Sequence, residues 1–403
     1  MSEEDVKIKT TEELKAEEQA QMREETESYF LDATQNYPEP YYMLEYNGVS
    51  FSTLGGIQAL SGQKKNGKTF VLAQLMAAIL GTDIEKSRTE ECLPGLQVPE
   101  RTLQYLRDKY KNPKYLPTVL YVDTEMEKLN SAKVLRRVHY LCGWPLDQPC
   151  NRFHVLWLRS VTDVKDNQGN VKERAYKKRY RLIRQAIDIL NPDAVFIDGI
   201  RDIIGDFNDN AESAALVGEL MAIAEKRHIC IWNTLHMNPR PGNDDDSKMR
   251  GHLGTELGNK ITDTLVSIKS KDNNGVVFTV KQQDARGKDM DDWKFEVTDE
   301  AGQLGIPKIV GNAGDSKRVE PVSDDPAVIR GWIEEAIKTY TWPMTRADIK
   351  KLVMCNIGGV KNAGRQQANL QVAINMKYLV ESTLRAGNGS YMLQPPNEDE
   401  MPF

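Results

Sequence analysis

The sequence predicts an α/β fold with a mostly parallel central sheet, followed by a small helical domain that ends in a hairpin. Strand-like and helical segments alternate from residue 40 to about 310, which is typical of layered α/β domains. The first four strand-like runs are nearly continuous in apolar character, as expected of strands buried on both faces of a parallel sheet. The runs occupy residues 118–125, 152–160, 193–200 and 229–236, and two more follow at 263–270 and 275–282.

A polar stretch divides the chain near residue 311. Its sequence, GNAGDSKRVEPVSDDP, is rich in Gly, Asp, Ser and Pro and is typical of a linker. At the other end, the first 33 residues are dense in Glu and Lys, and Thr10 or Thr11 could cap a helix there. This helix is either a solvated, partly frayed segment or an arm that docks on a neighbouring subunit. We expect an acidic helical arm at residues 1–33 and an α/β domain at 34–310. A linker at 311–325, a small domain at 326–394 and a tail at 395–403 follow.

The composition limits the classes of partner. A net charge of −6 shows that the chain as a whole is no polycation, so any contact with nucleic acid requires a local basic patch. The five cysteines form no C-x-x-C pair, which favours free thiols in a reducing cytoplasm over disulfides or a zinc site. No run of about 18 apolar residues is present, so we expect a cytoplasmic protein without a membrane span.

The stretch LSGQKKNGKTF contains the spacing G-x-x-x-x-G-K-[ST], which is the signature of a phosphate-binding loop. The glycines let successive backbone N–H groups face phosphate oxygens, and a helix that begins near Lys68 adds its positive end. In such loops the lysine reaches the β- and γ-phosphates, and the Thr69 hydroxyl binds Mg²⁺. We expect ATP and Mg²⁺ as ligands, held by Gly62, Gln63, Lys64, Lys65, Asn66, Gly67, Lys68, Thr69 and Phe70.

Carboxylates follow two of the predicted strands. Asp198 ends the run at 193–200, where it can join the Mg²⁺ shell beside Thr69. Glu125 follows the run at 118–125, where it can accept a proton from the water that attacks the γ-phosphate. The alternative is that Asp123 or Glu125 caps the helix that follows.

The run at 229–236 ends in Thr234 and His236, and His236 is a candidate sensor of the γ-phosphate. The alternative is a satisfied polar strand end without a switching role. Further on, a cation from one subunit that reaches the γ-phosphate of the next would stabilise the charge that develops during hydrolysis. Arg250, Lys281 and Arg286 are candidates for this role, and each is equally well explained as a solvated surface cation.

In this order, GQKKNGKT, YVDTE, NPDAVFIDGIRD, IWNTLH and MRGHLGTELGNKITDTLV resemble the RecA-like ATPase core. The resemblance covers about residues 50–300 and is to the DnaB/RepA branch of hexameric helicases and their mobile-element relatives. It implies that Lys68 and Thr69 bind nucleotide and Mg²⁺, that Glu125 is the base and that Asp198 joins the metal shell. It also implies that His236 is a phosphate sensor or DNA-loop trigger, and that the chain forms a homo-oligomer, such as a hexamer, on DNA.

Two features depart from that family. Its channel-facing loops carry basic residues for single-stranded DNA, whereas residues 205–213 and 238–249 are acidic or neutral, with only Arg240 and Lys248 as cations. Translocation on DNA is therefore less well supported than ATP hydrolysis. As a second departure, the insertion at 82–117 is longer than expected between the first helix and the next strand.

Positive charge is concentrated in two regions. In residues 171–190, apolar side chains at helical spacing predict a buried stripe, and the cations fall largely off it. This cationic face is either solvated or a surface for nucleic acid or another partner. The second region, between Pro326 and Leu393, has nine Lys and Arg residues against four carboxylates, a net charge of +5.

The C-terminal region resembles a winged helix in outline. Residues 327–340, 345–355 and 362–382 predict three helices, the second capped by Thr345, before a hairpin around 387–389. Side chains on the third helix, including Asn369 and Gln371, can contact phosphates and base edges in a major groove. A role in protein contacts alone is the alternative. The residues expected to bind single- or double-stranded DNA are Lys361, Arg365, Gln366, Gln367 and Arg385.

Three functions are consistent with these patterns. The first is an oligomeric helicase-like motor in replication or mobilisation of a plasmid, phage or integrative element. The second is an ATP-switched DNA-binding regulator or loader that unwinds nothing. The third is a small-molecule kinase, in which Arg88, Arg101 and Arg107 of the insertion would close over the transferred phosphate.

Overall fold

The computed structural model describes residues 11–396 except 28, 83–86, 238–248, 273–274, 286, 300–301, 303, 313–325, 359, 361–362 and 388–389. The chain divides into two compact units, Met1–Tyr41 and Tyr42–Phe403. The first unit contains helix α1 (Thr11–Glu27), in which Arg23 and Glu27 form an ion pair at 2.8 Å. Its described side chains are exposed, so α1 has no apolar face buried within the unit. No helix of the described residues is long and apolar enough to cross a bilayer.

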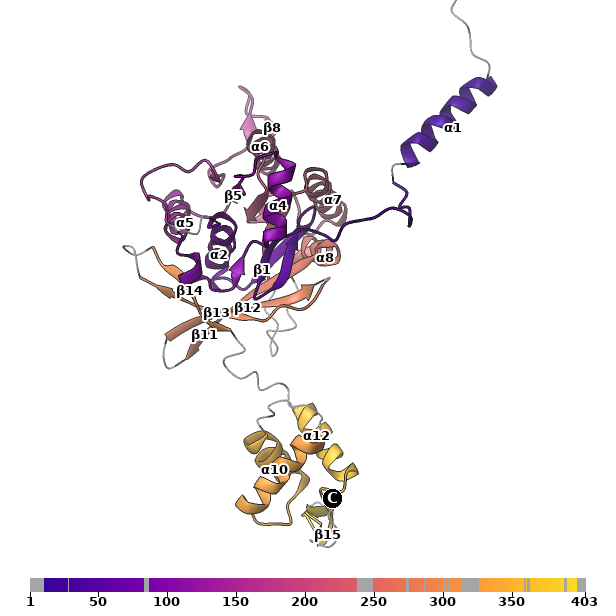
Figure 1. The fold of residues 1–403 in the computed structure, drawn as a ribbon, viewed down its shortest axis with the longest axis vertical. Coiled ribbons are helices and arrows are strands. Elements are labelled where there is room, and N and C mark those ends of the chain that lie inside the picture. Colours follow the sequence, from indigo (N-terminus) through magenta and orange to yellow (C-terminus); the bar gives the residue numbers. More distant parts are fainter. Residues whose placement is uncertain are drawn as a thin grey trace, which may run out of the picture. The chain divides into compact units, whose positions relative to one another are not determined.

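A nine-stranded sheet forms the centre of the second unit (Figure 1), and its strand order is β14-β13-β12-β11-β3-β10-β9-β5-β6. From β11 to β6 all neighbouring strands run parallel, whereas β12, β13 and β14 each run antiparallel to the strand before them. The predicted α/β fold with a mostly parallel sheet is therefore confirmed. The bounds are β3 (Ile57–Gly62), β5 (Val119–Asp123), β6 (Phe153–Trp157), β9 (Ala194–Asp198), β10 (Cys230–His236), β11 (Asp263–Asp272), β12 (Gly275–Ala285), β13 (Trp293–Thr298) and β14 (Ile306–Asn312).

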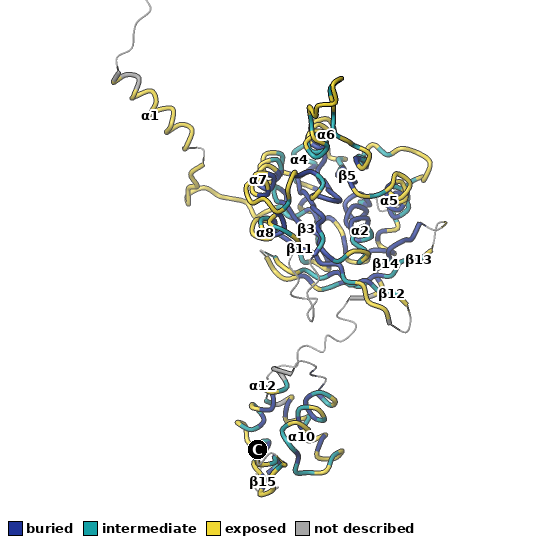
Figure 2. The backbone as a smooth tube through the Cα atoms, turned by 180° about the vertical axis from the view of Figure 1, so that it is seen from behind, coloured by how far each residue is buried: buried dark blue, intermediate teal, exposed yellow. Residues whose placement is uncertain are grey.

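Burial along the strands follows their place in the sheet (Figure 2). Strands β3, β5 and β9 are buried along their whole length, and β10 is buried up to its last residue. Strand β6 is mostly half-buried because it is the edge strand, although its sequence is as apolar as that of its neighbours. The last strand, β14, continues to Asn312, two residues beyond the boundary predicted at 310.

Helices that follow the parallel strands pack on the sheet. Helices α6 (Ala175–Leu190), α7 (Asn210–Arg227) and α8 (Gly251–Lys260) share one apolar core with alternate residues of the central strands, among them Ile57 and Ala59. Helix α2 (Lys68–Leu80) contacts α5 (Lys128–Leu141) and strands β3, β5 and β14. Ten consecutive residues of α2 are buried, as its apolar sequence predicts.

The insertion after α2 packs at the amino edge of the sheet. It contains α3 (Thr89–Cys92), β4 (Leu96–Gln97) and α4 (Glu100–Lys109), and β4 extends a small sheet with β1 (Tyr42–Tyr46) and β2 (Val49–Thr53). The hydroxyl groups of Tyr110 and Tyr115 donate hydrogen bonds of 3.1 and 2.8 Å to the carboxylate of Asp193. Since Asp193 immediately precedes β9, these bonds anchor the insertion where the parallel strands begin.

The C-terminal region has a core of its own. Helix α10 (Pro326–Thr339), the short α11 (Arg346–Asp348), the π-helix η3 (Ile349–Ile357) and α12 (Ala363–Asn375) precede β15 (Val380–Arg385) and β16 (Tyr391–Gln394). Thr345 caps α11 by accepting a hydrogen bond from the Asp348 N–H, as predicted. The helix predicted over 362–382 ends earlier, at Asn375, because Lys377 has a left-handed conformation with a φ of 57°.

Candidate functional site

The loop between β3 and α2 has a backbone that requires glycine. Gly62 and Gly67 have φ angles of 149° and 81°. A Cβ atom on Gly67 would lie 2.6 Å from the ring of Phe278, and one on Gly62 would lie 2.6 Å from the carbonyl oxygen of Ser267. The Ser267 hydroxyl also donates a hydrogen bond to the carbonyl of Asn66. Strands β11 and β12 therefore hold the loop in shape.

Lys68 begins α2 and lies against both the loop and the tip of β10. Its Nζ donates hydrogen bonds to the carbonyls of Gly62 and Gln63, at 3.1 and 3.2 Å, and lies 3.1 Å from Nδ1 of His236. Burial lowers the pKa of Lys68, and the nearby carboxylates of Asp198 and Glu125 oppose that shift. The first turn of α2 has no acidic residue, so its positive end stays available to an anion.

The strand register brings the predicted polar residues to one edge of the sheet. Asp123 on β5 lies opposite Asp198 on β9, and His236 on β10 lies opposite Gly62 on β3. All four strands run parallel, so these residues lie at their shared carboxyl edge, where the glycine-rich loop also begins. Open parallel sheets bind their ligands at this edge.

Asp198 is buried and oriented by two hydroxyl groups. Its Oδ1 accepts a hydrogen bond of 2.7 Å from Thr234, and its Oδ2 accepts one of 3.0 Å from Tyr121. Burial raises the pKa of Asp198, and the bond from Thr234 opposes this. Tyr121 is not among the site residues predicted from the sequence. Its position two residues before Asp123 was a usable signal, because residues i and i+2 share a face of a strand.

Glu125 follows β5, and a network around Asp123 holds it in place. Oδ1 of Asp123 accepts hydrogen bonds of 2.9 Å from the N–H groups of both Glu125 and Met126, and Oδ2 accepts one from Ser131. Neither Asp123 nor Glu125 is the N-cap of α5, since that residue is Glu127. Burial, together with the charges of Asp198 and Asp202, raises the pKa of Glu125 to about 7.

His236 lies between the lysine and the predicted base. Its Nε2 is 3.9 Å from Oε2 of Glu125, and its carbonyl accepts a 3.0 Å hydrogen bond from the Arg250 N–H. Burial and the charge of Lys68 lower the pKa of His236. A neutral imidazole allows Nδ1 to accept a hydrogen bond from the ammonium group of Lys68.

Of the predicted trans-acting cations, Arg250 contacts the cluster only through its backbone N–H in the hydrogen bonds given for the described residues. Arg250 is exposed at the start of α8, with its guanidinium 5.8 Å from the ring centre of Phe207. Lys281 lies on β12, where it pairs with Val266 of β11. Arg286 lies outside the described residues. A role for these cations in a neighbouring subunit stays a prediction.

The predicted DNA-binding residues have varied surroundings. Gln366 donates a 2.7 Å hydrogen bond to the Val360 carbonyl, Gln367 is exposed, and the Arg385 guanidinium lies over the ring of Tyr391 at 4.0 Å. Lys361 and the side chain of Arg365 lie outside what the structure describes. Asn369 is fully buried, so the expectation that it contacts DNA is wrong. Its helical position on α12 faces the core with Leu370 and Ala373.

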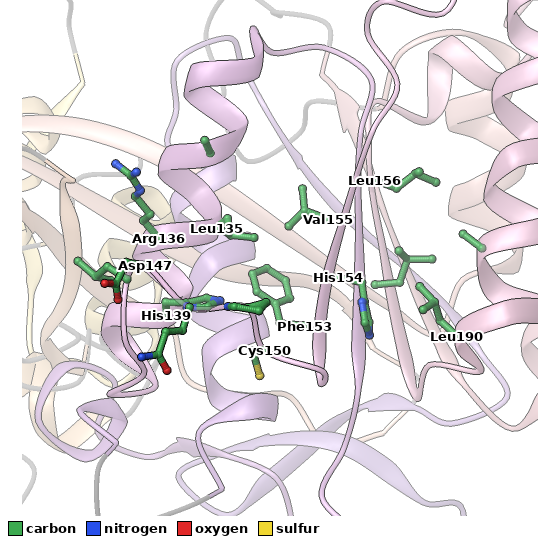
Figure 3. Close-up of a pocket in the computed structure, with 16 residues that line it drawn as sticks. Leu135, Arg136, His139, Asp147, Cys150, Phe153, His154, Val155, Leu156 and Leu190 are labelled. Carbon is green, nitrogen blue, oxygen red and sulfur yellow. The ribbon is translucent and has the colours of Figure 1, made fainter.

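A cavity of about 720 Å³ lies elsewhere, between α5, β6 and α6 (Figure 3). Leu135, His139, Phe153 and His154 are among the residues that line it. Nδ1 of His139 already lies 2.8 Å from the Pro145 carbonyl, and none of the predicted site residues lines the cavity. The site at the carboxyl edge is thus distinct from this cavity.

The residues of the edge site fit a nucleoside triphosphate with Mg²⁺. A side chain at Gly62 or Gly67 would clash with the Ser267 carbonyl or the Phe278 ring, so the conformation of this phosphate-binding loop depends on both glycines. The Asp198 carboxylate and the Thr69 hydroxyl are oxygen donors, which Mg²⁺ prefers. Both the backbone conformation of the loop and the oxygen donors near it therefore suit a nucleoside triphosphate with Mg²⁺.

Comparison with known proteins finds similarity in structure. No family model matches this sequence, and no curated protein matches it. Among solved structures, the KaiC-like protein PH0186 from the hyperthermophilic archaeon Pyrococcus horikoshii OT3 is similar, with 14% identity and a TM-score of 0.39. The similar region covers 68% of this chain and 99% of that one.

Proposed function

We propose that the chain is a RecA-like ATPase that hydrolyses ATP to ADP and phosphate. The observation that supports this most directly is the convergence of Lys68, Glu125 and His236 beside Asp198, at the carboxyl edge of a parallel sheet. Each of these residues comes from a different strand end or loop, so their meeting is a property of the fold.

The proposed roles follow from position and charge. The loop amides and Lys68 would bind the phosphates, and Thr69 and Asp198 would hold Mg²⁺, which would neutralise phosphate charge when bound. Glu125 accepts a proton from the attacking water, and a pKa of about 7 suits a general base at neutral pH. His236 contacts both Lys68 and Glu125, so it is placed to respond to the loss of the γ-phosphate.

We further propose that the ATPase acts on DNA as an oligomer, such as a hexamer, in replication or mobilisation of a mobile element. The C-terminal region supports a DNA contact because helices α10, η3 and α12 precede the hairpin of β15 and β16, which is the order expected of a winged helix, and because its net charge is +5. Met344, between α10 and α11, also forms a β-bridge with Leu393 of β16, which ties the hairpin to the helices.

A second candidate is an ATP-switched regulator or loader without unwinding activity. It is favoured by the loop between η1 (Ile200–Ile203) and α7, where Asp206 and Asp209 are exposed and no cation lies between Gly205 and Asn210. A kinase is less well supported, because the insertion that would supply its lid is anchored at the amino edge of the sheet. Arg88 and Arg107 of the insertion instead contact the Tyr140 carbonyl and Glu100.

The test is ATP hydrolysis by the full chain, with and without DNA. We expect Lys68→Ala to reduce the rate about 100-fold or more, since it removes a charge that stabilises the transition state. Lys133→Ala, which changes an exposed lysine of α5, is the matched control. Wild-type activity in Lys68→Ala would refute the proposal. Strand displacement on a forked duplex separates the motor from the regulator, since only the motor unwinds it.

A further inference from the structure

We propose that a basic surface on the α/β domain binds the phosphate backbone of DNA. The surface, here called the basic strip, consists of Lys165, Lys172, Lys177, Arg181 and Arg184. It combines the hairpin of β7 (Val164–Lys165) and β8 (Val171–Glu173) with one side of α6. The inference rests on the DNA association proposed above, but it concerns neither the nucleotide site nor the C-terminal region.

Local charge is the first argument. Residues 159–184 contain nine Lys and Arg residues against three carboxylates, a net charge of +6, whereas the whole chain carries −6. In contrast, residues 205–213 and 238–249 are acidic or neutral in sequence. Because DNA binding depends on cations that displace counterions, the strip is a stronger candidate for backbone contact than those two loops.

The strip has a regular spacing along α6. Lys177, Arg181 and Arg184 occupy positions i, i+4 and i+7 and are all exposed, whereas Ile183 and Ile187 are buried in the core. At 1.5 Å per residue the three cations extend over about 10 Å of helix axis. One strand of duplex DNA advances about 3.4 Å per nucleotide, so this length matches about three phosphates.

The carboxylates of residues 159–184 form hydrogen bonds or ion pairs with other residues of the same segment. Asp163 pairs with Arg174 at 2.9 Å, and Asp166 accepts hydrogen bonds from the N–H groups of Gln168 and Asn170 in the hairpin turn. Glu173 accepts two hydrogen bonds of 2.9 Å from the Arg181 guanidinium, which joins the hairpin to the helix. Within the described parts of the chain, Lys165, Lys172 and Lys177 form no ion pair. Three cations of the strip are therefore not held in ion pairs, although the charge of Lys165 acts on the Asp163 carboxylate.

Three further features of α6 and its surroundings bear on how DNA would bind. Lys177 lies in the first turn of α6, where the helix dipole disfavours a cation, although the Asp163 carboxylate accepts a 2.7 Å hydrogen bond from the Ala175 N–H at the start of this helix. The strip also ends at a cavity of about 640 Å³ between α6 and α7, which Arg184, Lys226 and Arg227 help to line. The Tyr180 hydroxyl donates its proton to Glu219 at 2.6 Å, so this ring is engaged within the fold. Contacts to phosphates, without stacking on bases, predict binding that is independent of sequence.

The experiment measures DNA binding by fluorescence anisotropy with the full chain, using two labelled 30-bp duplexes of unrelated sequence and a 30-nucleotide single strand. The test variant is Lys165→Glu/Lys172→Glu/Lys177→Glu. The control, Lys114→Glu/Lys133→Glu/Lys288→Glu, makes the same charge change at three other exposed lysines. Calorimetry with ATP–Mg²⁺ and circular dichroism are run on the wild type and on every variant. A second variant with Gln at the three strip positions removes charge without adding repulsion.

We expect the test variant to bind both duplexes at least about tenfold more weakly at low salt, and the control to stay within about twofold of the wild type. In the Gln variant, the slope of log K against log salt should become shallower by about 2 to 3 for duplex DNA, since about 0.9 counterion is released per phosphate contact. Unchanged ATP binding would separate this result from a failure of the nucleotide site.

Equal affinity of the test variant and the control would overturn the proposal, as would a wild-type chain that binds no DNA. Binding of the wild type and the test variant to poly-glutamate is measured in the same way. If the test variant lost binding to poly-glutamate but bound DNA as the wild type does, the proposal would also be overturned, because the strip would then recognise an acidic protein.

Discussion

The ammonium group of Lys68 lies 3.1 Å from Nδ1 of His236, although 168 residues separate them in the chain. The other ring nitrogen of the same histidine lies 3.9 Å from Oε2 of Glu125. One imidazole therefore contacts both the lysine of the phosphate-binding loop and the proposed base. A substitution at any of these three residues is therefore expected to alter the contacts of the other two.

Replacing the base should stop hydrolysis but not binding. We expect Glu125→Gln to lower the rate of ATP hydrolysis by about 100- to 10,000-fold, the usual contribution of a general base, because the amide cannot accept the proton of the attacking water. Affinity for ATP–Mg²⁺, measured by calorimetry, should stay within a few-fold. Near-normal hydrolysis in this variant would assign the base elsewhere.

The pH dependence should follow the same carboxyl group. Burial and neighbouring carboxylates raise the pKa of Glu125 to about 7, and a base acts only when it is deprotonated. We therefore expect kcat/KM for ATP, which reports the free enzyme, to rise with pH up to about 7 and then to level off. A profile that is flat between pH 5.5 and 8 would contradict this assignment.

The raised pKa of Glu125 also has a consequence for stability. A carboxyl group whose pKa is higher in the folded than in the unfolded chain lowers stability as pH rises from about 4.5 to about 7. Since 43% of the Glu125 side chain is exposed, solvent screening reduces this effect to about 1 kcal/mol. Above pH 7, Glu125→Gln should therefore melt about 2 °C higher than the wild type, and the difference should vanish near pH 4. Thermal unfolding at pH 4 and pH 8 measures this, and an equal Tm at pH 8 would count against it.

The hydroxyl group of Thr234 connects two elements of the site. It donates to Asp198 at 2.7 Å and accepts from the Gly199 N–H at 2.8 Å. We expect Thr234→Val to destabilise the fold by about 1–3 kcal/mol, because it leaves a buried N–H without a partner, and to raise the Mg²⁺ concentration needed for hydrolysis.

Thr264→Val is the matched control for this change. Thr264 is also a buried strand threonine, and its Oγ1 has no hydrogen-bond partner among the described residues. This variant should change the free energy of unfolding and the Mg²⁺ requirement little. Equal effects of the two substitutions would show that the Thr234 hydroxyl has no special role.

The conformation of Gly67 should be essential for nucleotide binding. Alanine at this position meets a φ of 81° and a Phe278 ring atom 2.6 Å from its Cβ, so Gly67→Ala should lower ATP affinity by about tenfold or more. Gly169→Ala meets a similar φ of 85° in an open turn, with nothing within 4 Å. It should leave ATP binding unchanged, which calorimetry on both variants would test.

Several features of the site could be predicted from local sequence. The spacing of Gly62, Gly67 and Lys68 indicates a phosphate-binding loop because that chemistry needs few residues, all close together in the chain. The apolar runs predicted the strands for a similar reason, since burial on both faces leaves a continuous apolar pattern. Asp198 and Glu125 could be selected as strand-end carboxylates without knowledge of which strands are neighbours.

Other features depend on contacts between distant segments. The order of the strands and their register place Asp123 opposite Asp198 and direct the Tyr121 hydroxyl to the same carboxylate. The position of the insertion depends on Tyr110 and Tyr115, which reach Asp193 from about 80 residues away. A polar residue in a helix, such as Asn369, can be assigned to a surface or a core only once its neighbours are known.

The sequence by itself determined the phosphate-binding loop, the strands and the strand-end carboxylates, because each is encoded by residue types within a short window. Only the tertiary structure decided that Lys68, His236 and Glu125 form one connected group, and that the acidic side chains near the basic strip are already paired. These relationships arise from strand pairing and side-chain packing between segments far apart in the chain, which local periodicity does not specify.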